Sequence, residues 1–270
     1  MRTDVGTVFS GVLVVAFALG VPVRPAEAQR PRNTCVACHS LQSGNTEGGH
    51  GFAAWKSSPH AAAGVTCEAC HGGNPAAADP AEAHQGVKRS SDQASRVYFT
   101  RVPETCGRCH AAEAAYFRSS IHSARLQSDG HGPNCVTCHG SMATRILTPD
   151  SVLITCSACH APGGVAPVGK SREAAQVLAL VRAENILFDI VSAAVSSSRS
   201  APGAAKARIL LDNSERHLLA AAEVWHSFRL DSATARLGDA RQTLSAAWMA
   251  LGHPKPREGQ LYRPPRAARP

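Results

Sequence analysis

The chain has 270 residues, a formal net charge of +8 and only 5% aromatic residues, so it offers little material for a large core of aromatic side chains. A basic balance can indicate nucleic acid or a membrane surface as partner. The N-terminal segment and the cysteine pattern described below indicate an exported protein, and we therefore expect no nucleic-acid partner.

The first element in chain order is a leader segment. Arg2 precedes an apolar run from Val8 to Val21, and a small-x-small sequence ends at Ala28. A basic start, a run of about 14 apolar residues and such an exit are typical of a secretory signal peptide. The run is short for a membrane span, which needs about 20 residues, although an uncleaved anchor is an alternative. The pattern predicts a signal peptide over residues 1–28 and a periplasmic mature protein from Gln29.

All ten cysteines lie in five copies of Cys-x-x-Cys-His, within a predicted core of residues 29–169. The motifs are formed by Cys35, Cys38 and His39, by Cys67, Cys70 and His71, by Cys106, Cys109 and His110, by Cys135, Cys138 and His139, and by Cys156, Cys159 and His160. This spacing is the attachment signal of c-type haem, in which two thiols bond to the porphyrin and the histidine binds the iron. The sequence predicts five covalently attached haems c.

Two other uses of cysteine explain the pattern less well. Structural zinc takes CxxC pairs two at a time, and five pairs do not divide into twos. Neither zinc nor a disulfide framework requires a histidine after each second cysteine. We therefore expect residues 29–169 to wrap around five apolar macrocycles. Short helices are predicted over Pro80–Gly86 and Ala111–Arg125, joined by glycine- and proline-rich loops with almost no β-structure.

Residues 170–253 change in composition and predict about three helices. Apolar residues at helical spacing predict the first over Arg172–Val195, with Ser171 as its N-cap, and the others over Ala204–Trp225 and Ser232–Leu251.

The last segment, residues 254–270, is basic and proline-rich, which predicts a disordered tail. The expected fold class is thus mainly α with much irregular loop: a multihaem core plus a C-terminal helical bundle, with almost no β.

Histidines outside the five motifs are candidates for the second axial ligands, because a low-potential haem commonly takes a second imidazole. The stretches Ser58-Pro-His60, Ala83-His84-Gln-Gly86 and Ser120-Ile-His122, with the motifs beside them, resemble multihaem cytochromes c related to the tetrahaem cytochrome of ammonia oxidisers and to the pentahaem nitrite reductases. The resemblance covers about residues 33–165. It implies that His60, His84 and His122 are distal ligands.

A fourth distal ligand is implied by the segment Trp225-His226-Ser227-Phe228, which resembles the Glu-x-His-Asn-Pro segment of several such cytochromes. Here Ser227 and Phe228 replace Asn and Pro. If His226 is a ligand, the helical segment is a clamp over the haem core and not an independent domain.

The fifth distal ligand is open. His50 and His131 lie in glycine-rich loops, and His217 is a weaker candidate on the same predicted helix as His226. Met142 occupies a position where relatives often have histidine, and a thioether ligand raises the reduction potential of a haem.

Five haems on so short a chain predict a periplasmic electron-transfer protein that works between redox protein partners. The alternative is an oxidoreductase that acts on a small nitrogen or sulfur species at a haem with an open axial position. The Cys-x-x-Cys-Lys motif of the nitrite reductases is absent from the sequence, which favours the carrier. Membrane contact is expected only through a partner or an uncleaved leader. Much of the positive charge is expected to pair with haem propionates, and docking to an acidic redox partner is a second interpretation.

Overall fold

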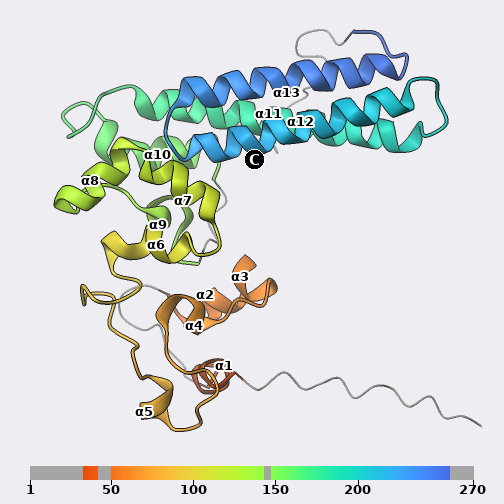
Figure 1. Ribbon diagram of the computed structural model, residues 1–270. Coiled ribbons are helices and arrows are strands. Elements are labelled where there is room, and N and C mark those ends of the chain that lie inside the picture. The colour runs from red at the N-terminus through yellow and green to blue at the C-terminus, as the bar shows by residue number, and fades with distance from the viewer. Residues whose placement is uncertain (1–32, 42–49, 143–146, 256–270) are drawn as a thin grey trace, which may run out of the picture. The chain divides into compact units, whose positions relative to one another are not determined.

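The computed structural model describes residues 33–41, 50–142 and 147–255, which belong to one compact unit (Figure 1). These residues form helices and loops and no β-strand, so the expected mainly α fold class is confirmed. The predicted signal peptide and the predicted tail from residue 256 onward lie outside the described residues. The elements are α1 (Thr34–His39), α2 (Phe52–Lys56), α3 (Pro59–Ala62), α4 (Cys67–His71), α5 (Pro80–Ala83), the 3₁₀ helix η1 (Phe99–Arg101), α6 (Val102–Cys106), α7 (Ala111–Arg118), α8 (Ile121–Asp129), α9 (Cys135–His139), α10 (Pro149–His160), α11 (Lys170–Ser197), α12 (Ala204–Trp225) and α13 (Leu230–Ala250).

Three short-range predictions are corrected by these bounds. The segment predicted as one helix over Ala111–Arg125 is two, because the Ser120 side chain accepts a hydrogen bond from Ser123 N and starts α8 as a new helix. The helix predicted over Pro80–Gly86 ends at Ala83. In the C-terminal segment, α11 begins after Gly169, and the expected N-cap Ser171 is buried inside the helix.

The second predicted bundle helix, α12, has the expected bounds, and its start depends on Gly203. This residue has φ +94°, a conformation that side chains with a Cβ rarely adopt. A Cβ there would also meet the carbonyl oxygen of Ala250 at 2.1 Å. The loop between α11 and α12 therefore passes close to the end of α13 only because residue 203 is glycine.

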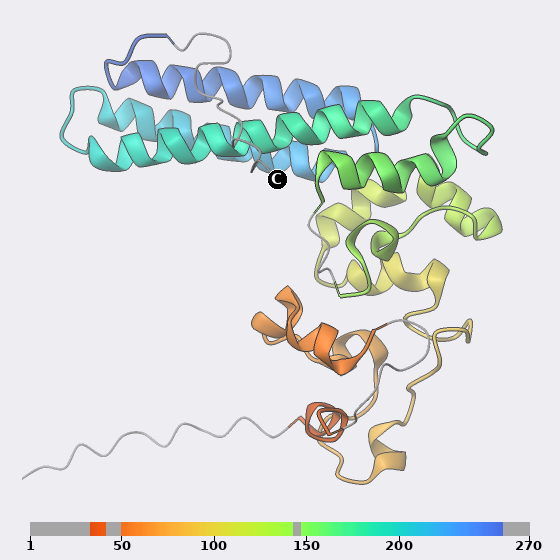
Figure 2. The same cartoon turned by 180° about the vertical axis from the view of Figure 1, so that it is seen from behind.

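The helices α11, α12 and α13 lie side by side along their length, as both views show (Figures 1 and 2). One of their two buried apolar clusters includes Val152 of α10, which packs with Val177 and Leu237, and Cys156 of the fifth CxxCH motif packs against it. Tyr116 of α7 packs against the same cluster. The bundle thus shares part of its core with two helices of the CxxCH region.

The other end of the bundle holds a second cluster around Val191 and Leu244. Between the clusters lies Glu184, which is 2% exposed. Arg241 on α13 donates from Nε to Glu184 Oε1 at 2.7 Å and from Nη2 to the same oxygen. Because a buried carboxylate is costly without a partner, this pair ties α11 to α13 in one register.

Replacing Arg241 with alanine is expected to destabilise the bundle, because it leaves the Glu184 carboxylate buried and unpaired. We expect a loss of about 2–3 kcal/mol, at the lower end for a buried pair because the Arg241 side chain is 46% exposed. The measurement is urea unfolding followed by far-ultraviolet circular dichroism. The matched control is Arg236→Ala, whose exposed contact with Asp239 should contribute less than about 0.5 kcal/mol. Equal losses in the two variants would contradict the assignment.

Within the described ranges, no helix has both the length and the apolar character needed to cross a membrane.

Candidate haem-binding sites

The CxxCH motifs adopt a helical turn, which puts the two cysteines and the histidine of each motif on one face. α1, α4 and α9 consist of or contain a motif, and the fifth motif is the last turn of α10. In the third, α6 ends at Cys106, but His110 N still donates to the Cys106 carbonyl at 2.9 Å. Residues three and four apart are neighbours on a helix. Each first cysteine therefore lies beside its second cysteine and its histidine.

The motif cysteines differ in exposure. Among the second cysteines, Cys38, Cys109 and Cys159 are exposed, whereas Cys70 and Cys138 are partly buried. The first cysteine of every motif is partly buried. A thioether forms only where the sulfur can reach the edge of the porphyrin, and none of these thiols is enclosed in the core. Attachment of haem at Cys38, Cys138 and Cys159, as at the other seven cysteines, stays a prediction that this exposure permits.

Each of the five motif histidines lies opposite one further histidine. The pairs, with the distance between ring centres and the angle between ring planes, are His39–His84 (6.1 Å, 66°), His50–His71 (5.8 Å, 52°), His60–His110 (6.3 Å, 75°), His122–His160 (6.0 Å, 72°) and His139–His226 (6.3 Å, 22°). No histidine belongs to more than one of these pairs.

This spacing fits one iron ion between the two imidazoles of a pair. A ring nitrogen lies about 1.2 Å from the ring centre and binds a transition metal at about 2.0 Å, so opposite ligands put their ring centres about 6.4 Å apart. The observed distances of 5.8 to 6.3 Å approach this value. The donor set, two thiols and two imidazoles at each motif, also fits a covalently attached haem.

Two distal candidates use the same local structure at a helix start. Ser58 caps α3 by accepting a hydrogen bond from Ala61 N, and Ser120 caps α8 in the same way. His60 and His122 are each the second residue of the helix that follows. A serine cap fixes the direction of the first turn, and with it the direction of the histidine.

Two other distal candidates lie at helix ends. His84 follows α5 and His226 follows α12, and in each case Nδ1 lies within hydrogen-bond distance of the carbonyl oxygen four residues earlier, that of Pro80 at 2.7 Å and that of Ala222 at 2.8 Å. If Nδ1 carries the proton, it donates to that carbonyl and leaves the lone pair of Nε2 for a metal. His160 has the same kind of contact, with the Pro167 carbonyl at 2.7 Å.

Several of the paired imidazoles are held in their neutral form. Burial lowers the pKa of His71, His122 and His139, and the neighbouring imidazoles lower it further. A neutral imidazole is the form that binds a metal. Removing these rings from water therefore favours their use as ligands.

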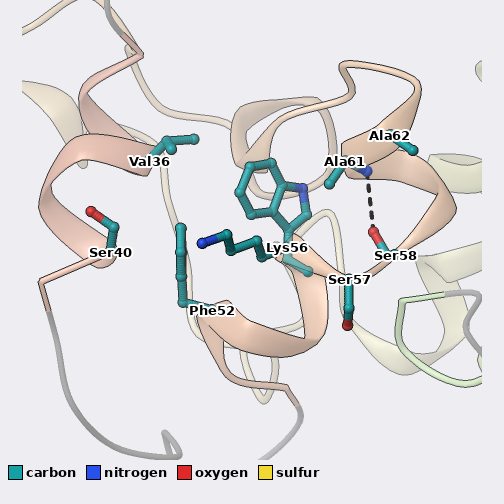
Figure 3. A pocket seen from close by; sticks show the side chains of 9 residues that line it. Val36, Ser40, Phe52, Lys56, Ser57, Ser58, Ala61 and Ala62 are labelled. Carbon is teal, nitrogen blue, oxygen red and sulfur yellow. Dashed lines mark hydrogen bonds between the residues drawn. The ribbon is translucent and has the colours of Figure 1, made fainter.

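A cavity of about 550 Å³ lies beside the first motif, and Figure 3 shows the side chains around it. Val36 lies within the motif, whereas Phe52 and Lys56 reach toward it from α2. The lining is mostly apolar, and Lys56 supplies one positive charge. An apolar hollow with a cation at its edge suits a macrocycle that carries propionates.

Of the candidates left open for the fifth distal ligand, the structure brings His50 to a motif histidine, His71. His131 is 81% exposed and lies 3.4 Å from the Asp129 carboxylate. His217 lies 3.9 Å from Asp239 on the bundle surface. Met142 is half-buried, in the turn that follows α9. The sequence does not predict which histidine pairs with each motif histidine, because nothing local to a CxxCH motif specifies the distant residue that faces it.

Comparison with known proteins agrees with this chemistry. Residues 19–72 match the family of cytochrome c554 and c-prime. The chain is 30% identical over 156 residues to the C-type polyheme cytochrome OmcB of Geobacter sulfurreducens, in strain DL-1 / KN400 and in strain ATCC 51573 / DSM 12127 / PCA. The match covers 49% of this chain and 20% of each relative, so the chain spans about a fifth of the relatives' length. No solved structure matches significantly. These similarities support a multihaem c-type cytochrome.

Proposed function

We propose that this chain binds five haems c, each between two imidazoles, and conducts electrons between redox protein partners in the periplasm. The observation that carries the proposal is the set of five histidine pairs, one for every CxxCH motif. When bound, haem supplies an iron that takes up and releases one electron. The protein's part is to attach the cofactor, fix its two axial ligands and set its distance from the next.

Contacts between successive motifs support a continuous path. The first two are joined by Asn33 Nδ2, which donates to Glu68 Oε2 at 3.0 Å. The pKa of Cys70 is raised, mainly by burial and also by the thiols of Cys106 and Cys109 in the third motif. The second and third motifs are therefore also close together.

The later motifs continue the series. The Cys106 thiol donates a hydrogen bond to Cys135, which raises the pKa of Cys106 and lowers that of Cys135. The third and fourth motifs are therefore close together. The fourth and fifth motifs lie on α9 and α10, which are in contact. Neighbours in sequence are therefore neighbours in space, as a path for electrons requires.

The alternative function, reduction or oxidation of a small nitrogen or sulfur species, needs an axial position that a substrate can occupy. A histidine opposite each motif histidine competes with any such substrate. The pairs therefore favour a carrier over an enzyme. Export to the periplasm is proposed on the leader pattern of residues 1–28, and the formal net charge of +8 is suited to an acidic redox partner.

The experiment is electron paramagnetic resonance of the oxidised protein, integrated for high-spin and low-spin iron. We expect five low-spin haems and no binding of carbon monoxide after reduction. Near-perpendicular imidazole planes keep two iron d orbitals close in energy and give strongly anisotropic signals, whereas near-parallel planes separate them and give a rhombic signal. Four pairs have plane angles of 52–75° and one, His139–His226, has 22°. Four anisotropic signals and one rhombic signal are therefore expected. A high-spin haem that binds carbon monoxide would favour the enzyme.

A further inference from the structure

The turn after α12 contains a strained residue. Phe228 has φ +58°, and among the described residues it is the only one other than glycine with positive φ. This conformation is unfavourable for a bulky side chain, and such residues cluster at functional sites. The turn is held around it: Phe228 N donates to the Trp225 carbonyl at 2.9 Å, and the buried Ser227 hydroxyl donates to the Val224 carbonyl at 2.7 Å.

The strained backbone directs the Phe228 ring onto His122. The two ring centres are 4.1 Å apart and the planes are at 84°, an edge-to-face contact. On α7, the ring of Phe117 packs near that of Phe228, with the two ring centres 6.5 Å apart. His122 is the imidazole opposite His160, so Phe228 contacts a distal ligand that lies far from it in sequence.

His122 differs from the other paired histidines with known Nδ1 partners. Nδ1 of His84, His160 and His226 each lies within 2.8 Å of a carbonyl oxygen. Nδ1 of His122 is buried and has no hydrogen-bond partner among the described residues. A hydrogen bond at this nitrogen normally fixes the ring plane of a metal-bound histidine and makes it a stronger base. At His122 this hydrogen bond is missing among the described residues, and the imidazole is instead in contact with the ring of Phe228.

We propose that Phe228 is a positioning residue, which fixes the imidazole plane of His122 and keeps water from its Nδ1. One turn then serves two haems: His226 is the distal ligand opposite His139, and Phe228, two residues later, orients the ligand opposite His160. The strain at Phe228 is the cost of directing both side chains from one short turn. This inference rests on the proposed haem ligation.

The test compares Phe228→Gly with Phe228→Tyr in the full-length haem-loaded protein. Glycine adopts positive φ without strain, so the turn keeps its backbone while the ring is lost. Tyrosine keeps the ring and is the conservative control. The readouts are electron paramagnetic resonance and a spectroscopic redox titration.

With Phe228→Gly we expect one of the strongly anisotropic signals to shift or broaden, because the His122 plane is no longer fixed. We also expect one reduction potential to fall, because water reaching Nδ1 makes the imidazole a stronger base. The rhombic signal of His139–His226 should persist, and Phe228→Tyr should behave as the wild type.

Unchanged signals and potentials in Phe228→Gly would overturn the inference, as would a change confined to the rhombic signal, which would make Phe228 a structural residue of the turn. The failure of the underlying function has a different signature, since it would appear in the wild-type protein as fewer than five low-spin haems.

Discussion

Replacing His226 with alanine is expected to convert one haem in five from low-spin to high-spin. The side chain is held at the end of α12, with Nδ1 2.8 Å from the Ala222 carbonyl, and its ring lies 6.3 Å from that of His139. Without it, the iron at His139 loses its second imidazole and gains an open position. About one fifth of the integrated iron should become high-spin, and carbon monoxide should bind to that share after reduction.

The spectrum identifies which haem has changed. His139–His226 is the pair with near-parallel planes, so the rhombic signal should be the one that disappears. The matched control is His217→Ala, on the same helix, because His217 faces Asp239 and no motif histidine. It should keep five low-spin haems. A fully low-spin His226→Ala protein would mean that His226 is not a ligand, and that the bundle does not close over the haem core in the way proposed.

Replacing His50 with alanine is expected to produce a high-spin haem of equal amount at another site. His50 and His71 have ring centres 5.8 Å apart, and burial keeps the His71 imidazole neutral by lowering its pKa. Their planes are at 52°, so an anisotropic signal should be lost and the rhombic signal should remain. The measurement is again integrated electron paramagnetic resonance, with carbon monoxide binding as a second readout.

Two variants test the other candidates for this position. His131→Ala removes an exposed histidine that lies beside Asp129, and Met142→Leu keeps a similar apolar volume without the sulfur. Both should retain five low-spin haems and unchanged potentials. If Met142→Leu gave the high-spin haem and His50→Ala did not, the fifth ligand would be the thioether, and its haem should have the higher reduction potential.

The bundle shows why some boundaries could be predicted and others could not. The bounds of α12 followed from its apolar spacing and from the glycine before it, which are local properties of the chain. The start of α11 did not, because Ser171 is a residue type that favours the N-cap but is buried within the first turn of the helix. The division between α7 and α8 has a local signal, because Ser120 is a capping residue whose side chain accepts a hydrogen bond from the first turn of α8.

The sequence by itself determined the covalent chemistry, because a CxxCH motif works within one helical turn: residues three and four apart share a face wherever that turn occurs. It also indicated His60, His84, His122 and His226 as axial ligands, through segments that resemble those of related cytochromes. Only the tertiary structure decided which histidine faces which motif, and that His50 is the one opposite His71. It also decided that Phe228 contacts His122. The physical reason is distance along the chain: the two members of each pair lie in separate elements, and only packing between those elements brings them together.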